Sequence, residues 1–378
     1  MERISLHSVC RWTFHAGRGG FVPGDAIPEW GADRLDTVGT VEMVAREIVP
    51  RLPDDVRLGM EFHYDYEVDE ENASAVAQAL VENGMYLAMI TPGAHRHFAY
   101  GGVASLDPGE RRRAEEFARR AVDLAYGPLR GSWHPDPDRY PTLVLWNGSW
   151  GYDLASPALA DMYRNLKESV ASLCRYEEER GGELYVALEP KPNEGHPAML
   201  LPTVASAILF WKRLAEEYGI DLRRKGVNKE FGHSEMIGLD PVYDTVEETD
   251  NGMLVHMHVN SQGYSDGLVL GGPGKFDVDH GVRVNGMTLA LAALARQAGF
   301  ERWKGHDLQP RPYDDRERAL DRVVRSILSW EACARAEREM DHARLREYLA
   351  RRDTGRAEDL IREAVVEACR KFDEMYRG

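Results

Sequence analysis

Five short segments place carboxylates and imidazoles together at the ends of apolar runs. They read EPKPNE at 189–194, EFGH at 230–233, HMHVN at 256–260, FDVDH at 276–280 and HDLQP at 306–310. Their Glu, Asp and His side chains supply about as many hard oxygen and imidazole ligands as a pair of divalent cations needs. The segments therefore predict a site that binds two divalent cations.

The chain around these residues explains how they can meet. Glu189 follows LYVAL, Glu230 follows KGVNK, His258 follows MLVHM and Asp307 follows WKGH, so each stands at or just beyond the end of a short strand pattern. In a parallel barrel the C-terminal ends of the strands gather at one face, where active sites are built. The pattern thus predicts one cluster from residues that are dispersed along the chain.

Apolar, β-rich runs alternate with helical patterns along most of the sequence. The expected strands are 4–10, 57–63, 86–91, 142–146 and four runs that end near 190, 230, 260 and 310. The expected helices include 37–50, 72–83, 109–125, 158–179, 204–218 and 286–298. This alternation predicts an α/β fold, a (β/α)8 TIM barrel, with a doubly wound sheet as the alternative.

The remainder of the chain, from about residue 312 onward, is highly charged and nearly all helical in pattern. We expect a barrel domain over 1–315 and a helical C-terminal extension over 316–378. Such an extension cannot bury its apolar stripe alone, so it should pack on the outside of the barrel or on a neighbouring subunit. The protein is accordingly expected to be a homo-oligomer, either a dimer or a tetramer.

Composition limits the range of partners. The net charge of −16 argues against a nucleic-acid partner, because phosphate binding depends on clustered Lys and Arg. No apolar run reaches the roughly 18 residues of a membrane span, and the segment MERISLHSVC lacks the features of a signal peptide. The four cysteines show no CxxC spacing. We therefore expect a cytoplasmic protein with reduced thiols and no membrane partner.

The strand-end motifs resemble those of the xylose isomerase family over roughly residues 4–330. EPKPNE followed by LLPT at 200–203 resembles the strand-five motif of that family, and EFGHSEM at 230–236 resembles its strand-six motif. The resemblance implies that Glu189 and Glu230 bind metal, with Glu230 bridging two ions. It also implies that Lys191 hydrogen-bonds the carbonyl oxygen of a sugar substrate.

The seventh strand differs from the xylose enzymes. His258 stands where they carry an aspartate, and FDVDHG resembles the DxDH segment of the L-rhamnose isomerases, whose first metal also takes a histidine. The two resemblances together imply seven ligands for two ions. The ligands of the first ion are Glu189, Glu230, His258 and Asp307, and those of the second are Glu230, His233, Asp277 and Asp279. The identity of the sugar stays open.

Other positions match residues that the family places around its sugar. The resemblance implies that His63 assists ring opening. The usual acid of the family falls at Tyr66 in this chain, and Asp65 beside it is expected to orient His63 instead. The resemblance also implies that Trp12 and Trp146 wall the sugar pocket and that Phe21 is contributed by a neighbouring subunit. Asn260, among the residues of the seventh strand, is expected to contact the sugar.

These residues predict a metal-dependent aldose–ketose isomerase that uses two Mg, Mn or Co ions and acts by a hydride shift on an open-chain sugar. One alternative is a sugar epimerase of the same barrel superfamily, which binds one metal and abstracts a proton with carboxylates. A phosphodiester hydrolase is a further alternative, disfavoured by the charge of −16. A non-catalytic sugar-binding protein is disfavoured by Lys191.

Overall fold

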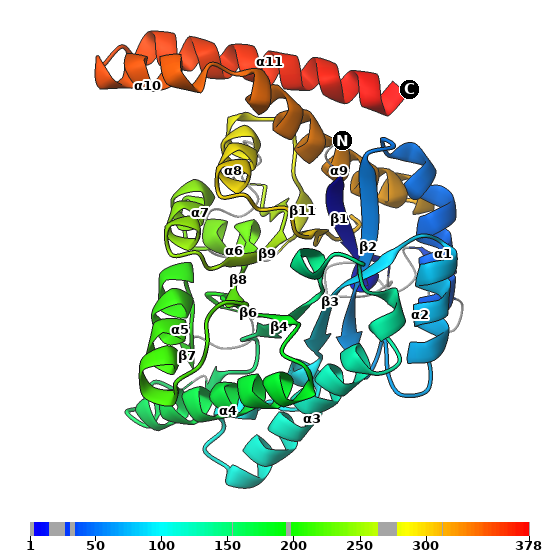
Figure 1. The fold of residues 1–378 in the computed structure, drawn as a ribbon, viewed down its shortest axis with the longest axis vertical. Helices are drawn as coiled ribbons and strands as arrows, with labels where there is room; N and C mark the ends of the chain where they lie inside the picture. The colour runs from blue at the N-terminus through cyan, green and yellow to red at the C-terminus, as the bar shows by residue number, and fades with distance from the viewer. Residues whose placement is uncertain are drawn as a thin grey trace.

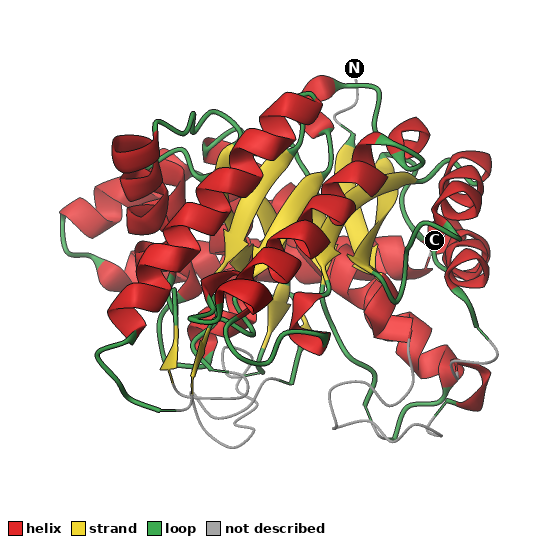
Figure 2. Cartoon of the chain, turned by 90° about the horizontal axis from the view of Figure 1, so that it is seen from below, coloured by secondary structure: helices red, strands yellow, loops and turns green. Residues whose placement is uncertain are grey.

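A computed structural model describes residues 4–14, 27–30, 35–152, 154–193, 198–263, 278–311 and 313–377. Eight parallel strands form a closed barrel in the order β1-β12-β9-β8-β6-β4-β3-β2. Helices surround these strands (Figure 2). The strands are β1 (Ser5–Cys10), β2 (Val56–Tyr64), β3 (Tyr86–Pro92), β4 (Thr142–Trp146), β6 (Tyr185–Glu189), β8 (Lys225–Glu230), β9 (Leu254–His258) and β12 (Lys304–His306).

The prediction of a TIM barrel is confirmed, because β1 pairs in parallel with both β2 and β12 and so closes the sheet. Each of the eight expected strands is present. A doubly wound sheet would leave two open edges, which this pairing excludes. Two short antiparallel pairs stand beside the barrel: β5 (Gly151–Tyr152) with β7 (Ala198–Met199), and β10 (Asn260–Ser261) with β11 (His280–Gly281).

The helices follow the expected alternation, and each of the six predicted ranges overlaps one helix. They are α1 (Thr37–Glu47), α2 (Ala73–Glu82), α3 (Pro108–Tyr126), α4 (Leu159–Arg180), α5 (Val204–Tyr218) and α8 (Gly286–Gln297). Two more, α6 (Phe231–Glu235) and α7 (Pro241–Asp250), lie between β8 and β9. Helix α5 shows why the boundaries were predictable. The Thr203 hydroxyl accepts from the Ser206 N–H at its start, and Gly219 ends it at φ 69°.

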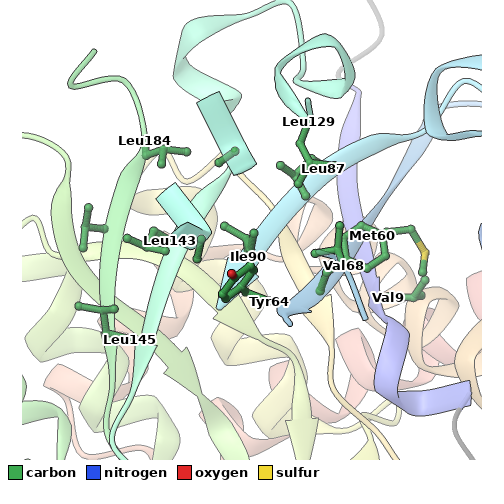
Figure 3. Packing of buried hydrophobic residues seen from close by; sticks show 14 of the residues in the cluster. Val9, Met60, Tyr64, Val68, Leu87, Ile90, Leu129, Leu143, Leu145 and Leu184 are labelled. Carbon is green, nitrogen blue, oxygen red and sulfur yellow. The ribbon is translucent and has the colours of Figure 1, made fainter. Parts of the chain in front are cut away.

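Alternation along the strands separates two environments. Val9, Met60, Leu87 and Leu143 belong to the apolar cluster that the strands share with the helices (Figure 3). The residues that alternate with these along each strand point to the other face of the sheet, into the barrel, because successive side chains of a strand alternate between faces. Glu61 of β2 hydrogen-bonds histidines of β9, a strand that is not its neighbour in the sheet. The interior of the barrel is therefore polar at this level.

The C-terminal helices are α9 (Arg316–Glu339), α10 (His342–Ala350) and α11 (Thr354–Arg377). Buried residues of α9, including Val323 and Ile327, belong to the same apolar cluster as the barrel strands. Helix α11 packs on α9, and the two helices α10 and α11 run along the outside of the barrel (Figure 1). The expected packing on the barrel is thus observed within one chain, while the domain boundary at 315 and 316 stays a prediction.

No helix among the described residues is both long enough and apolar enough to pass through a membrane.

Candidate metal centre and active site

Four strand ends bring their carboxylates and imidazole to one place. Glu189, Glu230 and His258 are the last residues of β6, β8 and β9, and Asp307 follows β12 directly. The Nδ1 atom of His258 lies 2.6 Å from Glu230 Oε2, 3.5 Å from Glu189 Oε2 and 3.8 Å from Asp307 Oδ2. The three carboxylates expected to hold the first ion therefore converge on one nitrogen of His258, which is the fourth expected ligand.

A buried carboxylate that the sequence analysis missed fixes the orientation of this imidazole. Glu61 Oε2 lies 2.9 Å from His258 Nε2, and Glu61 Oε1 accepts from Ser8 at 2.6 Å and meets His256 Nε2 at 3.0 Å. Burial alone would raise the pKa of Glu61, but His258 and His256 hold it well below its usual range. With Nε2 turned toward Glu61, the Nδ1 atom of His258 faces the three carboxylates, as a histidine ligand backed by a carboxylate does.

A second ligand group forms on the other side of Glu230. Its Oε1 atom lies 3.6 Å from His233 Nε2 and accepts a hydrogen bond from the Asn260 amide. The same amide lies 3.3 Å from Asp279 Oδ1. His233 is carried by α6, which begins immediately after Glu230, and its Nδ1 lies 3.0 Å from the Pro190 carbonyl. Donation from Nδ1 to that carbonyl leaves Nε2 as the ligand atom.

Glu230 thus belongs to two possible ligand sets at once. Ligand atoms of Glu230, His258 and Asp307 lie within 4.8 Å of one another, and so do those of Glu189, Glu230 and His233. Asp277, the remaining expected ligand, lies outside the described residues, as does Phe21. The structure therefore brings together five of the seven predicted metal ligands, and a sixth, Asp279, lies 3.3 Å from the Asn260 amide that also donates to Glu230.

The charge of this cluster fits a resident cation. Burial raises the pKa of Glu189 to about 8, and the neighbouring carboxylates of Glu230 and Asp307 add to the effect. Like charges buried together favour protonation unless a counter-charge lies between them. A divalent cation would supply that counter-charge, and the oxygen and imidazole donors suit Mg, Mn or Co. The residues present therefore fit the metal centre that the sequence predicts.

Aromatic side chains form a wall beside the cluster. Trp12 donates from Nε1 to Asp307 Oδ1 at 2.7 Å, and its ring lies 4.4 Å from that of His63. The His95 ring follows at 5.6 Å from His63 and stands edge-on to Trp146 at 4.7 Å. Trp12 and Trp146 were expected to wall the site. His95, which joins them through His63, was not among the predicted site residues.

Lys191 lies at the end of this wall. Its ammonium is 5.2 Å from the centre of the Trp146 ring, and the side chain is buried. The Asn147 amide donates to the carbonyl oxygens of Lys191, at 3.1 Å, and of Leu201, at 2.9 Å. Because Asn147 follows β4 and Lys191 follows β6, one amide fixes the chain that carries the ammonium beside the metal centre.

The partner of His63 differs from the prediction. Asp65, expected to orient it, pairs instead with the exposed His97 at 2.6 Å. The backbone at Asp65 is left-handed, with φ 85°, and the chain turns at this residue, which brings Glu67 back to His63. Glu67 then accepts from the His63 backbone N–H at 2.7 Å and lies 3.2 Å from its Nδ1. The buried Glu67 is therefore the carboxylate that positions this imidazole.

A search against protein-family models found no match. The fold resembles an L-ribulose 3-epimerase at 12% identity and TM-score 0.59, over 90% of this chain and 96% of that one. It resembles a candidate xylose isomerase from Rhodospirillum rubrum at 14% identity and TM-score 0.59, over 87% and 99%. A D-allulose 3-epimerase from Methylomonas sp., solved with D-allulose, matches at 13% identity and TM-score 0.55, over 86% and 96%. The chain shares the TIM-barrel fold of these proteins.

Proposed function

We propose that the protein is a metal-dependent sugar isomerase that interconverts an aldose and a ketose by a hydride shift. The observation that supports this function best is the position of Glu230. One carboxylate oxygen faces His258 and the other faces His233, 2.6 Å and 3.6 Å away. A carboxylate between two ligand groups suits a pair of cations rather than one.

Two bound cations would hold vicinal oxygens of an open-chain sugar and polarise its carbonyl group. The residues of the chain complete the site. The Lys191 ammonium donates to the carbonyl oxygen, where negative charge develops as hydrogen moves between the adjacent carbons. His63, held by Glu67, moves the proton of the ring hydroxyl during ring opening. Trp12 and Trp146 cover apolar faces of the sugar and exclude water.

A test of the reaction type uses heavy water. The protein is loaded with Mg, Mn or Co and supplied with aldoses and ketoses in turn, and the product of any conversion is examined by NMR. A hydride shift carries the hydrogen from C2 of the aldose to C1 of the ketose without exchange. Full deuterium incorporation at that carbon would instead require a carbon base and would contradict the hydride shift.

A second candidate function is sugar epimerisation at a single metal. It is favoured by the fold, which the chain shares with L-ribulose 3-epimerase and D-allulose 3-epimerase. It is also favoured by Glu189, whose pKa of about 8 suits a carboxyl group that exchanges protons near neutral pH. Epimerisation predicts one metal per chain and deuterium at the inverted carbon. Metal analysis after dialysis against Mn, together with the NMR result, separates the two functions.

Lys191 gives a sharper test, because an ammonium is a donor only and cannot bind a cation. Lys191→Met should reduce kcat at least about 100-fold while the metal content of the protein stays unchanged. Lys212→Met is the matched control, since Lys212 is exposed on α5 and pairs with Asn251. Near-normal kcat in Lys191→Met would remove this residue from the proposed mechanism.

A further inference from the structure

A second pocket, lined by none of the expected metal ligands that the structure describes, lies between the barrel and the C-terminal helices. Helices α9 and α11 pack together there, and α9 contacts β11 (Figure 1). With the chain after β12, they line a cavity of about 460 Å³. That volume lies within the usual range for a small-molecule site. His280, Arg283, Arg311, Arg322 and Arg325 all line it.

Two of the four arginines that line this cavity pair with acids. Arg322 pairs with Asp314, at 2.9 Å for one of its two contacts, and Arg325 pairs with Asp321. Within the described residues, the side chain of Arg311 has no carboxylate among its hydrogen bonds, although its backbone N–H donates to Asp314 at 2.7 Å. Its two terminal nitrogens donate to the carbonyls of Val278 and Asp279, and its Nε has no partner in that part of the chain.

The charge of the lining agrees with this geometry. Among the described residues that line the cavity there are four arginines and one acid, Asp373 of α11. The lining is therefore rich in positive charge, in a chain whose net charge is −16.

His280 supplies an independent sign of a ligand. Its side chain is only 8% exposed, and within the described residues its Nε2 atom is buried without a hydrogen-bond partner. Leaving a buried polar atom unpaired costs free energy. A ring nitrogen of histidine can donate a hydrogen bond to an oxygen or accept one from a hydroxyl group. A ligand oxygen in the cavity would pair with it.

Apolar side chains also line the cavity. They are Val282, Val284 and Phe372, and the Arg325 guanidinium lies 6.0 Å from the centre of the Phe372 ring. A site lined by both guanidinium groups and apolar side chains suits a molecule that carries both an oxyanion and a carbon skeleton. Guanidinium groups bind phosphate oxygens with two parallel hydrogen bonds, which favours phosphate as the anion.

We propose that this cavity binds a small organic phosphate, held by Arg283, Arg311 and His280, with its carbon skeleton against Phe372. The proposal does not depend on the reaction at the metal centre. The two sites are nevertheless linked through one residue. Arg311 Nη2 donates to the carbonyl oxygen of Asp279 at 2.8 Å, and Asp279 is an expected metal ligand. A phosphate on Arg311 therefore contacts the group that positions this ligand.

Isothermal titration calorimetry tests the proposal with glycerol 3-phosphate as the probe, and with glycerol and inorganic phosphate as comparisons. The phosphate ester should bind at least tenfold more tightly than inorganic phosphate, and glycerol should not bind. Arg283→Gln, an exposed position, should raise the Kd of the ester at least tenfold. Arg213→Gln, which removes the same charge from α5, should change the Kd less than twofold.

Lys191→Met distinguishes the cavity from the metal centre, and it should leave the Kd within twofold. Two results would overturn the proposal. The first is no binding of the ester to a folded protein. The second is binding that survives Arg283→Gln but is lost in Lys191→Met, because the phosphate would then occupy the metal centre. Equal affinity for inorganic phosphate would overturn the role given to Phe372.

Discussion

Two buried clusters of histidine and glutamate lie within one barrel and are built on opposite principles. At the mouth of the barrel, three carboxylates converge on one nitrogen of His258. Between the barrel wall and α9, a chain of hydrogen bonds runs from Ser326 to His306, His7 and Glu331, with 2.8 Å at each step. The first cluster gathers several carboxylates around one imidazole nitrogen, whereas in the second cluster both imidazoles and Glu331 are hydrogen-bonded within the chain.

The difference separates a binding site from a structural network. In the chain beside α9, the Ser326 hydroxyl donates to His306, His306 donates to His7 and His7 donates to Glu331, so both imidazoles are satisfied in the neutral form. This chain of hydrogen bonds therefore needs no bound ion to satisfy its polar groups. In the cluster at the mouth, burial and the nearby carboxylates of Glu230 and Asp307 raise the pKa of Glu189. The geometry of this cluster therefore calls for a cation from outside the chain.

The largest expected effect follows from removing the carboxylate shared by both ligand groups. Glu230→Gln should lower the metal content by at least one ion per chain and reduce activity at least about 100-fold, since it removes a direct ligand. Metal analysis after dialysis against Mn and assays on the converted sugar measure this. Glu331→Gln is the matched control, because it changes a buried glutamate of the other cluster. Full metal content in Glu230→Gln would contradict the assignment of Glu230 as a ligand.

The next effect concerns Glu61, which touches the metal centre only through His258. Glu61→Gln should weaken Mn binding about 10–100-fold, because an amide cannot accept from His258, His256 and Ser8 together and the imidazole loses its fixed orientation. Titration calorimetry with Mn measures the change. An unchanged Mn affinity would show that the orientation of His258 does not depend on this carboxylate.

For the hydrogen-bonded cluster beside α9, we expect pH to change the stability of the protein rather than its binding of metal. Burial lowers the pKa of His7 to about 4, below its unfolded value of about 6.5. A depressed pKa means that the folded state resists protonation, so stability is full above about 6.5 and is lost as the pH falls toward 4. This residue alone should cost about 2 kcal/mol between pH 7 and pH 5.

His7→Gln tests that figure, because a glutamine accepts from His306 and donates to Glu331 without titrating. Urea unfolding at pH 7 and pH 5 gives the free energy of unfolding for both proteins. The loss on acidification should be smaller in the variant by about 2 kcal/mol. An identical loss in the two proteins would mean that His7 carries a proton in the folded state at pH 5.

The sequence predicts the first cluster far better than its surroundings. Glu189, Glu230, His258 and Asp307 are recognisable because each ends an apolar run, and parallel strands bring their ends together. Glu61 lies inside such a run, in RLGMEFH, where alternation between the two faces of a strand marks it as pointing inward. This alternation is visible in the sequence, but nothing in the run indicates which residues across the barrel Glu61 contacts.

The cavity beside α11 could not be predicted in this way. Arg322 and Arg325 stand one turn apart on α9, but Arg283 and Arg311 belong to separate segments whose spacing gives no sign that they meet. They converge only because α9 and α11 pack over the chain that follows β11 and β12. The local backbone geometry at Asp65 is equally hard to predict from the sequence. A left-handed conformation is uncommon for an aspartate, so the turn at Asp65 carries no clear sequence signal.

That turn yields the smallest effect, a test of which carboxylate serves His63. Glu67 is buried against His63, whereas Asp65 is exposed and pairs with His97. Glu67→Gln should lower kcat about tenfold for a sugar supplied in its ring form, because the imidazole loses the group that holds its proton. Asp65→Asn should change kcat less than about twofold, since an exposed ion pair contributes little. The reverse order would restore Asp65 as the partner, and it would mean that the turn rearranges when substrate binds.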